Sequence, residues 1–210
     1  MRGAIRRAGT AVLATAVLAT AVLAVGLVGC TSDSDGDDAK AEACTDGAYA
    51  WATVTRTEKL TALADPIRFE KETDSYSAAL KPVDDTVYRP RVTGAPEDVG
   101  AARVIKALGA HLTVEVPLAG PSDTVRPEDD HYFEVGTADL KGDYYSWGEI
   151  ALVEADFTYV CEGKSSKGHV LTWETTGSGF LPCSSPADGE AGRTAARETC
   201  PADSAAVKQA

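Results

Sequence analysis

Residues 150–161, with the sequence IALVEADFTYVC, carry the clearest structural pattern in the chain. Apolar and polar side chains alternate along this stretch, as they do in a half-buried β-strand. The odd-numbered side chains from Ala151 to Cys161 are expected on one face of the strand. Glu154, Asp156 and Thr158 are expected on the other face. This pattern is typical of an antiparallel sheet that is packed on one side and wet on the other.

Further strands and two helices are predicted on either side of this stretch. Spacing of apolar residues between Pro96 and Gly109 predicts one internal helix, and residues 187–199 predict a second helix that Pro201 ends. The sequence GKSSKG predicts a hairpin loop over 163–168, and Gly177-Ser178-Gly179 predicts a turn. We therefore expect an α+β fold, an antiparallel β-rich single domain with one internal and one C-terminal helix. Strands are predicted over 48–57, 67–72, 132–137 and 169–175.

The N-terminus has the layout of a secretory signal, with a basic start and a long apolar run. This run ends in Leu27-Val28-Gly29-Cys30, which resembles the lipobox of bacterial lipoproteins. The resemblance implies cleavage before Cys30 and a diacylglyceryl group on its sulfur, which would place the protein on the outer face of the cytoplasmic membrane. The alternatives are an uncleaved membrane span and twin-arginine export.

Composition divides the remaining chain into parts. We expect a signal peptide over 1–29, followed by the lipidated cysteine and a disordered acidic tether over 30–43, since this segment lacks large apolar residues. A globular domain over 44–201 and a flexible tail over 202–210 would follow. Removing the three leader arginines lowers the number of basic residues from 20 to 17 against 32 acidic ones, a net charge near −15. Such a surface repels phosphate backbones, so no nucleic-acid partner is expected.

The cysteines predict two disulfide bonds. Four remain besides Cys30, an even number in an exported domain. Three pairings of these four are possible. We favour Cys44–Cys161, which would join the opening strand to the longest later one, and Cys183–Cys200, which would fasten the C-terminal helix.

A search for chemistry gives one candidate group of catalytic residues. Glu154 and Asp156 would share one face of a strand, and Glu174 on the neighbouring strand could join them. Paired carboxylates can hydrolyse a glycosidic bond, although these residues also fit the solvent face of a sheet. Residues 129–131 (DDH) could form a metal site, supply a general base, or be the polar end of a loop. We expect no metal or cofactor, because the chain has no C-x-x-C motif and its three histidines are scattered.

Aromatic residues supply weak candidates for binding. Tyr144, Tyr145 and Trp147 lie so close in sequence that some of them could be exposed and stack on sugars or on a partner protein. Packing at a corner of the sheet is the competing interpretation. Together with WETTGSGF at 173–180, the stretch Asp143-Tyr144-Tyr145 resembles small envelope lipoproteins of high-G+C bacteria that have no assigned activity. This resemblance implies a location and no reaction.

The sequence thus favours a membrane-anchored extracytoplasmic lipoprotein whose domain is a non-catalytic module. Its expected partners are an envelope protein or a wall polymer, together with the membrane that holds its anchor. The competing hypothesis is a small cell-wall glycan hydrolase that uses the paired carboxylates.

Overall fold

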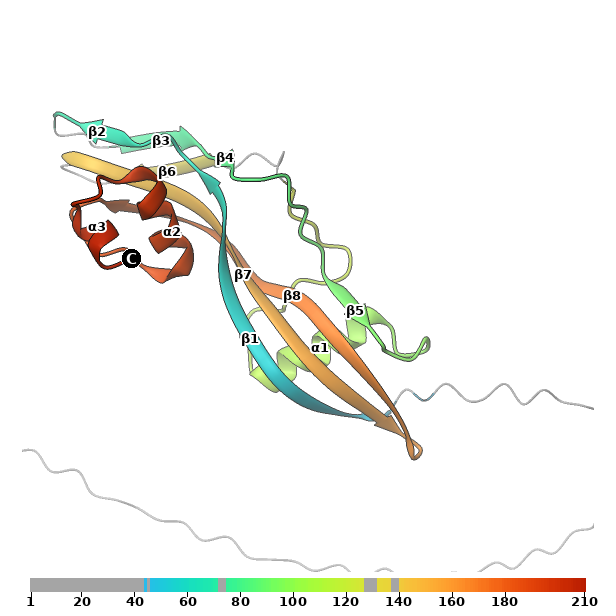
Figure 1. Ribbon diagram of the computed structural model, residues 1–210. Helices are drawn as coiled ribbons and strands as arrows, with labels where there is room; N and C mark the ends of the chain where they lie inside the picture. The colour runs from blue at the N-terminus through green and yellow to red at the C-terminus, as the bar shows by residue number, and fades with distance from the viewer. Residues whose placement is uncertain (1–43, 45, 72–74, 127–131, 137–139) are drawn as a thin grey trace, which may run out of the picture. The chain divides into compact units, whose positions relative to one another are not determined.

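The computed structural model describes residues 44, 46–71, 75–126, 132–136 and 140–210. The chain divides into the units Met1–Lys40 and Ala41–Ala210, and all described residues belong to the second. Strands dominate this unit, with a few helices beside them (Figure 1). In chain order the elements are β1 Ala48–Leu63, β2 Ile67–Phe69, β3 Ser75–Ala79, β4 Lys81–Pro82, β5 Arg91–Thr93, α1 Ala101–Leu112, β6 Tyr132–Gly136, β7 Gly142–Cys161, β8 Lys164–Pro182, α2 Gly189–Thr199 and α3 Ala205–Lys208.

The main sheet is built around β7, which pairs with β8 on one side and with β1 on the other. Its strand order is β4-β1-β7-β8-β5, and β2 also pairs with β7. Strands β3 and β6 form a separate two-stranded sheet. Every pairing among these strands is antiparallel. The predicted antiparallel, strand-rich fold is confirmed.

The turn between β7 and β8 is shorter than the sequence predicts. Lys164 already pairs with Cys161, so Glu162 and Gly163 alone form the turn and the predicted loop over 163–168 is wrong. Both turn residues have positive φ, 50° for Glu162 and 77° for Gly163. Positive φ at both positions is the geometry of a two-residue type I′ turn, whose twist matches that of the flanking strands. Strand β8 can therefore begin immediately after the turn.

The predicted turn at Gly177-Ser178-Gly179 is also wrong, because these residues continue β8. They pair with the segment 147–149 of β7. Gly179 lies opposite Trp147, and a Cβ atom at this position would overlap the indole ring. Glycine is present here because a buried ring approaches the backbone closely.

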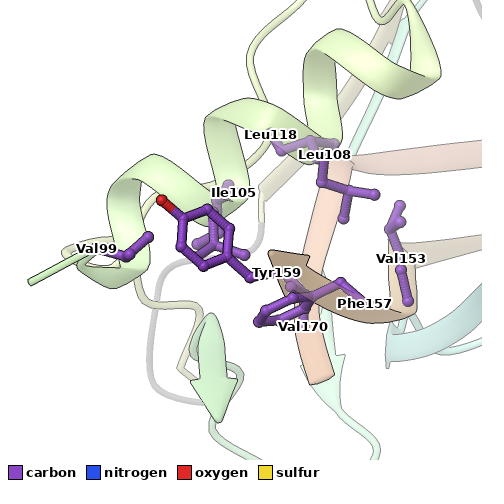
Figure 2. Packing of buried hydrophobic residues seen from close by; sticks show 10 residues of the cluster. Val99, Ile105, Leu108, Leu118, Val153, Phe157, Tyr159 and Val170 are labelled. Atoms are coloured by element: carbon purple, nitrogen blue, oxygen red, sulfur yellow. The ribbon is translucent and has the colours of Figure 1, made fainter. Parts of the chain in front are cut away.

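The two faces of β7 have different neighbours, but the predicted wet face is only partly exposed, because Ile150 and Leu152 on that face are buried. Odd-numbered side chains between Val153 and Tyr159 pack against α1 and the residues beside it. Figure 2 shows Leu108 of α1 near Val153, and Ile105 above Phe157 and Val170. Nearer the start of β7, the odd-numbered residues pack against α2 and α3. On the opposite face, Glu154 and Asp156 are exposed.

Helix α1 begins and ends later than the sequence predicts. Pro96 lies in a turn before it, and Gly100 has a φ of 67°, which is incompatible with the helix, so the helix starts at Ala101. Gly109 is inside the helix, which ends at Leu112 and is followed by Thr113 in a left-handed conformation. Among the residues that the structure describes, no helix has the length and apolar character needed to cross a membrane.

Both favoured disulfide bonds are present. Cys44 and Cys161 join the start of β1 to the end of β7, with their Cα atoms 6.0 Å apart. Cys183 and Cys200 join the end of β8 to the end of α2, with a Cα separation of 5.6 Å. Beyond this bond the sequence predicts a flexible tail over 202–210. The structure instead forms α3 there, with Ala206 fully buried, so packed structure extends past Pro201.

Candidate functional site

The paired carboxylates lie on an open face of the main sheet. Glu154 and Asp156 are exposed on β7, with 50% and 64% of their side-chain surfaces accessible. His169 of β8 lies between them, with Nδ1 2.9 Å from an Asp156 oxygen and Nε2 3.9 Å from a Glu154 oxygen. Such exposed contacts contribute little to stability. The two carboxylates lie on the solvent face of the sheet, as the sequence also allows.

Glu174 does not join this pair. The register pairs Glu154 with Leu171 and Val153 with Thr172, and paired residues share one face of the sheet. Glu174 lies two residues after Thr172 on β8, so it shares the face of Thr172. Glu154 is on the opposite face. Glu174 accepts a hydrogen bond from Arg56 Nε at 2.9 Å. The expectation that Glu174 completes a group of three carboxylates is wrong, because the β-sheet places neighbouring side chains on alternating faces.

The candidate aromatic binding residues are mostly part of the core. Tyr145 and Trp147 expose only 1% and 4% of their surfaces, and they stack on each other beneath α2. Tyr144 is half-buried and stacks on Phe180. The binding interpretation is therefore wrong for Tyr145 and Trp147. Burial raises the pKa of Tyr145, and no described residue hydrogen-bonds to its hydroxyl group.

The predicted cluster at residues 129–131 and the lipidation site Cys30 lie outside the described residues. Within the described ranges, no three histidine, cysteine, aspartate or glutamate side chains are grouped to hold a metal ion.

A groove of about 800 Å³ lies between β1, β4 with the residues after it, and α2. We call it the acidic groove. Its lining includes half-buried Leu60 and Leu63 and the exposed side chain of Val83. Lysines contribute two positive charges, from Lys59 and Lys81. Carboxylates contribute five negative charges, from Glu58, Asp65, Asp84, Glu190 and Glu198.

Several of these charges are already compensated within the protein. Lys81 Nζ lies 2.6 Å from an Asp65 oxygen. Glu58 Oε2 accepts a hydrogen bond of 2.8 Å from the backbone N–H of Glu190, at the positive N-terminus of α2. Hydrogen bonds from Thr86 lower the pKa of Asp84, and nearby Lys59 lowers it further, so Asp84 stays ionised near neutral pH.

The wall formed by α2 carries two glutamates, of which Glu190 lies in the positively polarised first turn and Glu198 lies near the other end of the helix. Glu190, Thr194 and Glu198 line the groove at intervals of four residues, which places them on one face of the helix. Glu190 and Glu198 are exposed, and neither forms an ion pair with another described residue. This wall can attract cationic groups from solution.

No family model, curated protein or solved structure matches this chain.

The sequence did not predict the acidic groove. Its walls come from segments near residues 58–66, 81–88 and 190–199, which only the tertiary fold brings together. One usable signal was present in the sequence, because Glu190, Thr194 and Glu198 recur at helical spacing in the predicted C-terminal helix.

Proposed function

We propose that this chain is a lipid-anchored extracytoplasmic lipoprotein with a single α+β domain that binds a partner without catalysis. We place it on the outer face of the cytoplasmic membrane, held by a diacylglyceryl group on Cys30. The disulfide bonds support this proposal. They join Cys44 to Cys161 and Cys183 to Cys200, so none of these four cysteines is paired with Cys30. Disulfide bonds of this kind form in oxidising compartments.

The acidic groove is the observation that carries the binding function. Its apolar lining, including Leu60 and Leu63, can hold the aliphatic part of a lysine or arginine side chain, while Glu190 and Glu198 meet the charged end. Strand β4 pairs only with Ala62 and Leu63, so the adjoining edge of β1 has no strand partner in the described part of the chain. An unpaired edge can hydrogen-bond to an extended segment. The partner that fits is an envelope protein with an extended basic segment.

The function is tested by crosslinking the tagged full-length chain in intact envelopes and measuring which partner it captures in a pull-down. Glu198→Lys should lower the capture of the partner by about tenfold, because an added cation repels the basic segment. Lysine near the C-terminus of α2 interacts favourably with the helix dipole, so folding should be retained. The matched control is Glu97→Lys, a charge reversal at an exposed residue outside the groove, and it should leave capture unchanged.

Three outcomes would contradict the proposal. Equal capture by the Glu198→Lys variant and the wild-type chain would remove the groove from the binding surface. Capture that is insensitive to salt would exclude an electrostatic contact. Recovery of a wall polymer in place of a protein would replace the proposed class of partner.

A further inference from the structure

A second hollow, of about 500 Å³, lies between α1 and the residues that follow it up to Pro121. We call it the α1 hollow. It shares no lining residue with the acidic groove. Pockets for small molecules typically measure about 300–1,000 Å³, have largely apolar walls and contain few polar groups. The α1 hollow therefore has the size of a site for a small molecule.

The helical wall of this hollow is made by residues with small or apolar side chains. Four residues of α1, separated by three, four and one positions, line the hollow: Ala102, Ile105, Gly109 and Ala110. This spacing places them along one side of α1. The small side chains leave space that larger ones would fill. Ile105 also belongs to the buried core, so the wall is attached to a packed part of the protein.

The opposite wall comes from the segment after the helix. Val114, Pro117 and Leu118 line it, and Leu118 is buried against the core. Gly109 faces this wall closely, because a Cβ atom at its position would lie 3.4 Å from Val114 Cγ2 and 3.7 Å from Leu118 Cγ. The two walls thus meet at Gly109, and the space beside this contact has the apolar surroundings that suit a hydrocarbon chain.

Charged and exposed apolar groups are found beside the hollow. Lys106 and Glu115 both line it, both are exposed, and neither forms an ion pair with a described residue. Val116, a large hydrophobic side chain in the segment after α1, is 64% exposed. A ligand with an apolar chain and one charge of each sign would match these groups.

We propose that the α1 hollow binds the acyl chain of a zwitterionic single-chain lipid, a lysophospholipid with an amine in its head group. The acyl chain lies between α1 and residues 114–118. Lys106 interacts with the phosphate, and Glu115 interacts with the ammonium group. This site is separate from the acidic groove, and its occupation does not depend on the partner proposed for that groove.

Photocrosslinking tests the site with the full-length chain reconstituted in lipid vesicles. The probe is a lysophosphatidylethanolamine with a photoactivatable group on its acyl chain, and the crosslinked peptides are mapped by mass spectrometry. We expect crosslinks within residues 102–121. Ala110→Leu should lower their yield about tenfold, because the larger side chain takes the place of several methylene groups. Leucine is a good helix former, so α1 should stay folded.

Matched variants separate the site from general contact with the membrane. Ala50→Leu makes the same change at an exposed position of β1 and should leave the yield unchanged. Lys106→Glu and Glu115→Lys should each lower the yield, and the double variant with both changes should restore it. Crosslinks outside residues 102–121, or an unchanged yield in Ala110→Leu, would overturn the site. Failure of the double variant to restore the yield would overturn the zwitterionic head group.

Discussion

At the scale of single residues, Trp147 packs closely against two glycines. Its indole ring lies against Gly179 of β8 and Gly192 of α2, and a Cβ atom at either glycine would contact the ring too closely. The ring nitrogen donates a hydrogen bond of 2.8 Å to Glu149, so this buried polar group is satisfied. These contacts hold α2 against the sheet, and α2 forms one wall of the acidic groove.

Replacing Gly179 with alanine should destabilise the protein by about 1–3 kcal/mol, because the added methyl group overpacks the contact with Trp147. Chemical denaturation with the disulfides intact measures this change. The control is Gly177→Ala on the same strand, where the nearest neighbour of the new methyl group is a Glu149 side-chain atom at 3.7 Å. A change within about 0.5 kcal/mol is expected for the control. Equal losses in the two variants would contradict the packing explanation.

At the scale of elements, the β7–β8 hairpin determines the register of the main sheet. Its strands have 20 and 19 residues, and the two-residue turn at Glu162 and Gly163 aligns them. Glu162 occupies the first turn position with a φ of 50°. Glutamate is uncommon in this conformation, because only glycine, asparagine and aspartate adopt positive φ readily. The turn therefore stores conformational strain at Glu162.

Replacing Glu162 with asparagine should stabilise the protein by about 0.5–1 kcal/mol, because Asn-Gly is the preferred pair in a type I′ turn. The midpoint of urea denaturation is the measurement. Glu162→Gln serves as the control, since it removes the same charge without favouring positive φ. An equal gain from glutamine would show that the charge, and not the backbone conformation, limits stability at this turn.

At the scale of the whole molecule, the five cysteines have two expected roles, disulfide bonding and the proposed lipidation. Four of them close bonds at the two ends of the main sheet, over sequence separations of 117 and 17 residues. Bonds of this kind restrict the unfolded chain and typically contribute a few kcal/mol each. In the proposed lipoprotein, Cys30 carries the lipid. Its two acyl chains would be enough to hold the protein stably at a membrane.

Intact-mass spectrometry of the protein purified from membranes tests this assignment. The wild-type chain should begin at Cys30 and carry the added mass of a diacylglyceryl group. Cys30→Ala should lack that mass and should no longer be cleaved at this position. The control is the double variant Cys44→Ala and Cys161→Ala, which should keep the lipid. A wild-type chain that retains residues 1–29, or a Cys30 without lipid, would contradict the anchor.

Local patterns located strands near residues 48, 132 and 150, and the alternating side chains near 48 and 150 were the main signal. The predicted ranges 48–57 and 150–161 were too short, because β1 extends to Leu63 and β7 begins at Gly142. The cysteine count predicted two disulfide bonds, and the order of elements favoured the observed pairing. Glycines were less informative. The sequence predicts the end of a helix at Gly109 and a turn at Gly179, yet both glycines lie inside regular elements. The sequence does not show which distant residue approaches a glycine.

The leader pattern, the spacing of apolar residues and the cysteine count were readable without a structure, since each depends on residues close together in the chain or on composition alone. The positions of the candidate sites depend on distant residues. Glu174 is separated from Glu154 by the alternation of faces across paired strands, and the acidic groove is assembled from three segments around β1. Register and packing bring such residues together or keep them apart, and these arise only when the whole domain folds.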